Sequence, residues 1–154
     1  MMKKLWIYQS NRFLSDAEVA HLSERLTSFV QQWSAHGNQL AGSFEIKYNL
    51  FVCLMVDESI AHVTGCSVDK SVNTLKQLAQ EVGIDLFDRL QIAYRDNETA
   101  TIQVVPSSVF QELMDEGKVN LDTVVFNNML TDADALETAW EVPVKHSWHA
   151  KVYA

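Results

Sequence analysis

Residues 43–56 read SFEIKYNLFVCLMV, and this stretch decides the fold class. Between residues 43 and 48 apolar and polar side chains alternate, which predicts a strand with one exposed face at the edge of a sheet. Asn49 then suits a turn. Residues 50–56 are apolar at every position, which predicts a central strand buried on both faces. The protein is therefore expected to contain a sheet with other structure packed against it.

A first helix precedes these strands. Residues 15–18 read SDAE, a capping box whose first and last side chains satisfy free N–H groups at a helix start. Apolar residues then recur at spacings of three and four as far as Trp33, which is the pattern of one buried helix face. We expect His36 and Gly37 to close this helix, because glycine tolerates the left-handed conformation that follows a helix end.

A second helix follows the central strand. Residues 65–69 read GCSVD, which predicts a helix start with Cys66 or Ser67 as the cap. Gly83 is expected to end the helix. Its inner face is predicted to carry Val68, Val72, Leu75, Ala79 and Val82.

Three further strands are predicted, at residues 4–9, 90–95 and 101–105, and the last two form a hairpin. The order along the chain is then β-α-β-β-α-β: the strand at 4–9, the first helix, the two strands within residues 43–56, the second helix and the strand at 90–95. This is the ferredoxin-like arrangement. The predicted fold class is therefore α+β. Its core is a ferredoxin-like sheet, antiparallel or mixed, followed by a C-terminal α/β extension.

The chain is expected to be a single domain, residues 1–154, with its core at about 3–105 and the extension at about 106–154. Both core helices lie on one face of the predicted sheet, so the extension or a second copy of the protein must cover the other face. A monomer and a symmetric homodimer are both compatible with this expectation. The extension is predicted to contain a helix at 107–116, a strand or helix at 124–130, a helix at 132–140 and an extended end at 144–153.

The composition excludes several classes of protein. Hydrophobic residues make up 47% of the chain and charged residues 21%, which is ordinary for a folded domain. The net charge of −8 and the scattered Lys and Arg residues argue against nucleic acid as a partner. The apolar run at residues 50–56 is far shorter than the roughly 20 residues that a membrane helix needs. No membrane association is therefore expected.

The first residues, MMKKLWIY, offer too short an apolar region for a signal peptide, which predicts a cytoplasmic protein. Cys53 and Cys66 would then be free thiols, because that compartment keeps thiols reduced. No pair of histidines stands four residues apart on a predicted helix, so no metal and no other cofactor is expected. His146 and His149 are predicted to be surface residues or hydrogen-bonded partners of the fold.

Five short stretches, by their order and spacing, carry a resemblance to a known family: WSAHG at 33–37, VDE at 56–58, GCSVD at 65–69, LFDR at 86–89 and SWH at 147–149. The chain resembles, over most of its length, a family of small uncharacterised bacterial proteins whose members are sometimes labelled ABC transporter ATPases. Such an ATPase needs the phosphate-binding pattern GxxxxGK[ST], whereas Gly117 and Lys118 are followed here by Val119. The resemblance therefore implies a bacterial protein and supplies no activity.

The predicted topology brings several reactive side chains to one edge of the sheet. In the ferredoxin-like arrangement the end of the first helix, the end of the third strand and the start of the second helix share that edge, and the end of the fourth strand reaches it too. The catalytic candidates there are Cys66, His36 and Asp57. The ligand-binding candidates are Glu58, Ser67, Asp69 and Arg95.

These candidates allow different kinds of function. The positive end of a helix dipole favours the thiolate form of Cys66, and His36 would then serve as the base in nucleophilic catalysis. Alternatively, free N–H groups at the helix start bind an anionic ligand. In the third interpretation Cys66 and Ser67 only cap a helix. Because no reaction demands this residue set, the function is unknown and we predict a binding or scaffold module without catalysis. A small enzyme or small-molecule-binding protein is the alternative.

Overall fold

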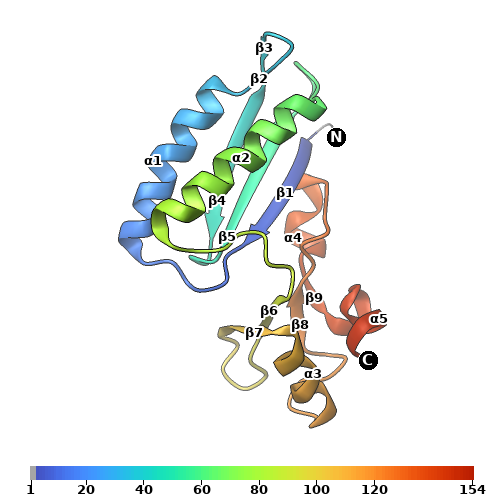
Figure 1. Cartoon of the computed structure of the whole chain (residues 1–154). Helices are drawn as coiled ribbons and strands as arrows, with labels where there is room; N and C mark the ends of the chain where they lie inside the picture. The colour runs from blue at the N-terminus through green and yellow to red at the C-terminus, as the bar shows by residue number, and fades with distance from the viewer. Residues whose placement is uncertain (1–2) are drawn as a thin grey trace. The chain divides into compact units, whose positions relative to one another are not determined.

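The computed structural model describes residues 3–154 and divides the chain into two compact units (Figure 1). The first unit contains the residues up to Asp88 together with Thr131–Asp134. The second unit contains Arg89–Leu130 and Ala135–Ala154. Each unit combines helices with an antiparallel sheet, so the predicted α+β class is confirmed.

The sheet of the first unit places the predicted strands in the predicted order. Its strands are β1 (Lys3–Gln9), β4 (Ala41–Lys47) and β5 (Phe51–Asp57), and β5 lies between the other two with antiparallel pairing on both sides. The apolar stretch is therefore the central strand, and the alternating stretch ends the sheet. Tyr48 and Asn49 form the turn between them, both at positive φ, where an asparagine is tolerated well.

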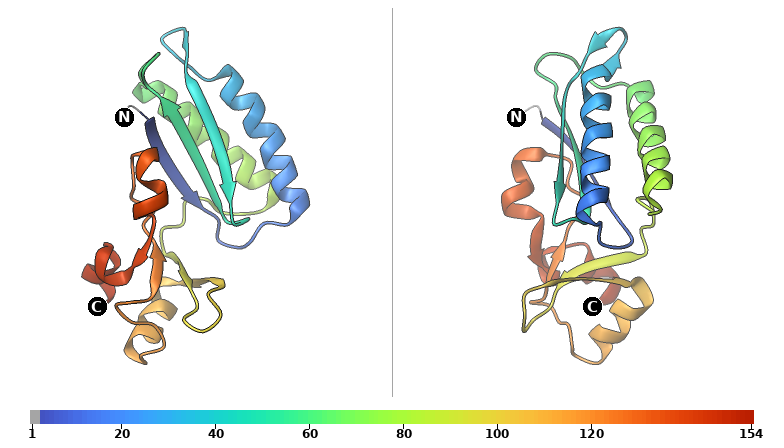
Figure 2. Two further views of the ribbon diagram at one scale, coloured as in Figure 1. Left: turned by 180° about the vertical axis from the view of Figure 1, so that it is seen from behind. Right: turned by 90° about the vertical axis from the view of Figure 1, so that its left-hand side faces the viewer.

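Two long helices, α1 (Asp16–Gln32) and α2 (Gly65–Val82), cover one face of this sheet (Figure 2). The predicted capping box at the start of α1 is present, with Ser15 and Glu18 each accepting a backbone N–H bond from the other. The core between helices and sheet is built from apolar side chains of both layers. They include Leu22 and Leu26 of α1, Val52 and Leu54 of β5, and Leu75 and Leu78 of α2.

The end of the first helix differs from the prediction. The helix stops at Gln32, and a small hairpin of β2 (Ser34–Ala35) and β3 (Asn38–Gln39) follows. His36 and Gly37 form the turn of this hairpin, with φ of 50° and 78°, so they do not cap the helix. The helix ends earlier because Trp33 turns to an extended conformation and buries its indole, whose Nε1 donates to the Ser67 carbonyl at 2.8 Å.

The start of the second helix also needs a correction. Thr64 is the N-cap residue, and Ser67 is the third helical residue of the same capping box. Cys66 therefore caps nothing. Gly83 ends the helix in the left-handed conformation, as predicted. The inner face is rotated relative to the prediction and buries Ser67, Ser71, Leu75, Leu78 and Ala79.

The second unit has a sheet of its own, with the order β7-β6-β8-β9 and antiparallel pairing throughout. The hairpin predicted at residues 90–105 is present as β6 and β7, but it belongs to this sheet. The strands are β6 (Gln91–Arg95), β7 (Ile102–Pro106), β8 (Val124–Phe126) and β9 (Glu141–Pro143). The α-helices are α3 (Ser107–Asp115), α4 (Leu136–Ala139) and α5 (His149–Tyr153), and η2 (Val144–His146) is a short 3-10 helix. A further 3-10 helix, η1 (Ala133–Ala135), begins in the segment Thr131–Asp134 of the first unit and ends at Ala135.

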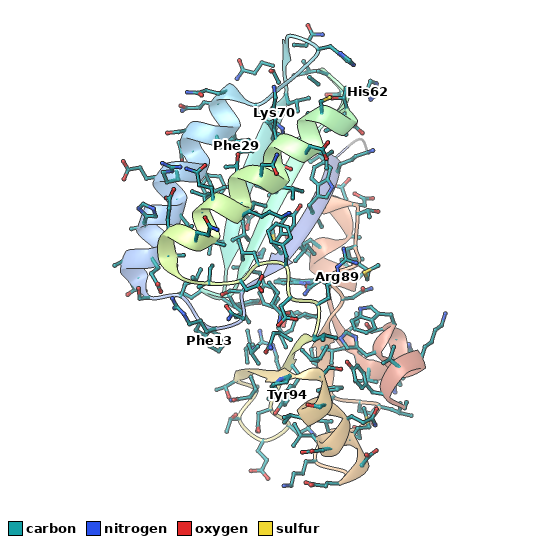
Figure 3. All side chains as sticks on the ribbon, in the orientation of Figure 1. Phe13, Phe29, His62, Lys70, Arg89 and Tyr94 are labelled. Carbon is teal, nitrogen blue, oxygen red and sulfur yellow. The ribbon has the colours of Figure 1, made fainter. Side chains whose placement is uncertain are left out.

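The ferredoxin-like arrangement is not confirmed, because its fourth strand does not join the first sheet. Beside β1 lies instead the segment Thr131–Asp134, where the Leu5 amide donates to the Thr131 carbonyl at 2.9 Å. Strand β6 has its own apolar partners: Tyr94, which Figure 3 labels, packs on Phe110 of α3 with ring centroids 5.6 Å apart. A strand that buries its apolar side chains locally is not driven to join a sheet elsewhere.

The C-terminal extension differs from the prediction as well. The stretch 124–130 is a strand only over β8, and the helix expected at 132–140 is broken into η1 and α4. The end expected to be extended is mostly helical, as η2 and α5. The extension or a second copy was expected to cover the open face of the first sheet. Val125 of the extension packs instead in the core of the second unit with Ile92, Phe110, Val144 and Tyr153.

Candidate functional site

The acidic residues at the end of β5 bind backbone groups of the loop that follows. Asp57 Oδ1 accepts a hydrogen bond from the Ser59 amide at 3.0 Å, and this bond lowers the pKa of the Asp57 carboxyl. The side chain of Glu58 is only 8% exposed, and its Oε2 accepts from the Val63 amide at 2.9 Å. The two carboxylates therefore hold the loop between β5 and α2 in one conformation.

Glu58 also has two cationic or titratable neighbours. His62 Nδ1 lies 3.4 Å from Glu58 Oε2, and Lys4 Nζ lies 3.9 Å from Oε1. The His62 side chain itself is largely exposed, and Figure 3 shows it beside the first turn of α2. His62 was not among the residues predicted from the sequence, because a spacing of four residues brings side chains together on a helix and residues 58–64 form a loop.

The polar groups at the start of α2 are used mostly by the helix itself. Ser67 is buried, its amide binds Thr64 Oγ1 at 3.2 Å, and its Oγ bridges the Thr64 amide and carbonyl at 2.8 Å each. Cys66 and Asp69 are exposed on the first turns. The N-cap arrangement thus provides hydrogen-bond partners for the amide and the hydroxyl of Ser67, and it leaves Cys66 exposed to solvent.

His36 lies at the turn of the β2–β3 hairpin and is exposed. Figure 1 draws this hairpin at the same end of the first unit as the start of α2. Within residues 3–154 no hydrogen bond or ion pair joins His36 to Cys66 or to Asp57. The catalytic candidates are therefore near one end of the unit without forming a nucleophile–base pair.

Arg95 does not belong with the other candidates. It lies on β6 in the second unit, where its Nε donates to Glu141 Oε1 at 2.6 Å and its Nη1 to the Ala100 carbonyl at 2.8 Å. The prediction placed Arg95 at the shared edge only because β6 was expected in the first sheet. The observed pair ties β6 to β9, which is a role within the second sheet.

A second titratable group lies in the core of the second unit. His149 is only 2% exposed, its ring stacks on Trp148 with centroids 3.8 Å apart, and its Nδ1 is 2.7 Å from Ser147 Oγ. Burial lowers the pKa of His149 to about 4. The prediction of a hydrogen-bonded partner of the fold is confirmed for His149, while His146 is exposed.

Neither a metal centre nor a membrane helix appears in the part of the chain that the structure describes. Residues 3–154 contain no group of three His, Cys, Asp or Glu side chains placed to hold a metal ion. Every helix in that range is too short or too polar to cross a lipid bilayer.

Comparison of the chain with protein-family models, with curated proteins and with solved structures finds no match. No function is assigned by these comparisons, so the inference of function depends on the geometry of the chain itself.

Proposed function

We propose that the protein is a binding or scaffold module without catalysis, and that the loop of residues 58–64 between β5 and α2 is part of its contact surface. The observation that carries this proposal is the side chain of Ile60, which is 77% exposed on a loop whose backbone is held from both ends. A large apolar side chain on a fixed loop presents contact area without an ordering cost on binding.

The hydrogen bonds around the loop support a role in presentation over a role in chemistry. Asp57, Glu58 and Ser67 each accept a hydrogen bond from a backbone amide, of Ser59, Val63 and Thr64 respectively. A general base needs its acceptor aimed at a substrate proton, whereas one oxygen of each of these carboxylates is aimed at a backbone amide. Asp57, Glu58 and Ser67 therefore stabilise the conformation of the loop of residues 58–64.

Affinity capture from a cell extract tests the contact surface. Proteins retained by the immobilised wild-type chain are compared with those retained by Ile60→Asp and by the control Val152→Asp. Val152 suits the control because it is also apolar, is 58% exposed and lies on α5 of the second unit. We expect a partner that is lost with Ile60→Asp and kept with Val152→Asp. Partners lost equally with both variants, or with neither, contradict the proposed surface.

Alkylation kinetics test the enzyme alternative, in which His36 activates Cys66. That alternative requires that His36→Ala slow the reaction of Cys66 with an alkylating reagent at neutral pH. The binding module requires no such effect, because no bond connects the two residues. A rate that falls severalfold in His36→Ala, with Asn38→Ala as a control in the same hairpin, favours the enzyme.

We propose membership of the family of small bacterial proteins named above, a cytoplasmic location, and no nucleic acid among the partners. The five sequence stretches quoted above support the family, the net charge of −8 argues against nucleic acid, and the short apolar runs support the location. We also propose that the first unit is a ferredoxin-like unit reduced to its first three strands, supported by the order β1-β5-β4.

A further inference from the structure

Strand β7 is an edge strand of the sheet in the second unit (Figure 2). Within residues 3–154 no strand pairs with that edge, since β7 is bonded to β6 alone. The other end of the sheet, β9, has three residues and ends in Pro143. The edge of β7 is the longer of the two and is open to pairing through its backbone.

The backbone bonds at the two ends of the β6–β7 ladder show which residues face outward. The Asp96 amide donates to the Thr101 carbonyl at 2.8 Å, and the Ser107 amide donates to the Leu90 carbonyl at 2.7 Å. Bonded positions alternate along an antiparallel strand. Gln103 and Val105 therefore direct their N–H and C=O groups to β6, as Thr101 does with its carbonyl. Ile102 and Val104 direct theirs to the outer edge.

This edge lacks the charges that usually protect an edge strand. Residues 101–106 read TIQVVP and contain no charged side chain. By contrast, β4 at the end of the first sheet carries Glu45 and Lys47. Edge strands that stay unpaired commonly carry lysine or other charges, and an uncharged, β-branched edge is suited to pairing with another strand.

We propose that the outer edge of β7 pairs with β7 of a second copy of the chain, antiparallel and about a two-fold axis at Gln103. Only one register uses both outward residues of both copies. It pairs Ile102 with Val104 of the second copy and Val104 with Ile102 of the second copy, each pair exchanging both backbone bonds.

The neighbouring residues exclude the other two-fold registers. An axis at Ile102 places Val104 opposite Ala100, which lies in a turn with φ of 60° and does not continue the strand. An axis at Val104 places Ile102 opposite Pro106, which has no N–H to donate. The residues that flank the strand thus select Gln103 as the centre.

The side chains of this register are compatible on both faces. Gln103 meets its own copy, and two amide side chains can exchange a hydrogen bond. On the opposite face, half-buried Ile102 and Val104 of each copy become neighbours and form an apolar cluster. The paired edge is short, so the dimer is expected to be weak and to depend on protein concentration.

Charge substitutions at the axis test the proposal. Gln103 is exposed, and within residues 3–154 its side chain makes one hydrogen bond, to Thr101 Oγ1 at 3.2 Å, so Gln103→Lys and Gln103→Glu should both fold. Sedimentation velocity over a range of concentrations should show a weak dimer for the wild type and less dimer for either variant alone. An equimolar mixture of the two variants should restore the dimer, because opposite charges then meet at the axis.

A backbone variant tests the same edge independently. Val104→Pro removes an N–H that β6 does not use, so the fold should persist by circular dichroism while the dimer is lost. A monomeric wild type at the highest concentration, a mixture that dimerises no better than the single variants, or a dimer that survives Val104→Pro would each overturn the proposal. If β7 pairs instead with a strand of another protein, mixing the two Gln103 variants does not restore a dimer, and that result also refutes the proposal.

Discussion

The buried histidine of the second unit predicts a specific loss of stability in acid. His149 packs on Trp148 and near Phe110, and the only hydrogen bond to its ring in residues 3–154 comes from Ser147. No carboxylate bonds to the ring, so an imidazolium there would be buried without a counter-ion. Burial lowers the pKa of His149 from the ordinary 6.5 to about 4.

The sign of the effect follows from the two pKa values. Above about pH 6.5 the ring is neutral in both the folded and the unfolded chain, so it adds no pH dependence. Between about pH 6.5 and about pH 4 the unfolded chain binds a proton at His149 that the folded chain does not, and the free energy of unfolding falls. Each pH unit is worth about 1.4 kcal/mol, so acidification to about pH 4.5 removes about 2.5 kcal/mol.

Urea unfolding of the wild type and of His149→Phe, followed by tryptophan fluorescence, measures this loss. Phenylalanine keeps an aromatic ring against Trp148 and gives up the bond to Ser147, at a cost of about 1 kcal/mol near neutral pH. Near pH 4.5 the order of stability should reverse. Protonation of carboxylates affects both proteins equally and cancels in the difference. A constant difference between the two proteins at both pH values, or an NMR titration of the His149 ring centred near 6.5, would refute the reasoning.

Other substitutions test the packing of the first unit. Cys53 is fully buried, which raises the pKa of its thiol to about 12, so exposed Cys66 should be alkylated first in the native protein, as mass spectrometry will show. Cys53→Ser should cost about 1–3 kcal/mol in thermal or urea unfolding, and Cys66→Ser close to nothing. Thr64→Ala removes the N-cap of α2 and should cost about 1 kcal/mol. Gly42→Ala places a Cβ 2.9 Å from the ring of Trp33 and should cost about 1–3 kcal/mol by overpacking, whereas unchanged melting would contradict that contact.

The first unit was predictable because its signals are long and local. The capping box at residues 15–18, the alternation at 43–48 and the apolar run at 50–56 each identify an element and the face it buries. The error at His36 has a local cause. A glycine after a helical pattern is compatible with a helix cap and with a hairpin turn, and the burial of Trp33 decides between them in three dimensions.

The second unit was not predictable in the same way. The pattern of residues 90–105 indicates a hairpin, but it does not say which sheet the hairpin joins. That choice depends on β8 and β9, which have three residues each and are too short to show any period. The helix α5 has five residues and no side-chain cap, so its sequence shows neither a capping residue at its start nor the periodic apolar pattern of a buried helix face.

The candidate site shows why residue type at a strand end or a helix start does not by itself identify function. Carboxylates, hydroxyls and small residues gather at such places because free backbone N–H groups need acceptors there. Ser67 and Glu58 meet this need, since their oxygens bind the amides of Thr64 and Val63. Cys66 and His36 accept no hydrogen bond from these backbone amides, and both are exposed. The hydrogen-bond partner of each side chain therefore separates residues that stabilise the loop from residues that are available to a partner. For Ser67 that partner follows from the rotation of the inner face of α2, which the sequence pattern did not resolve.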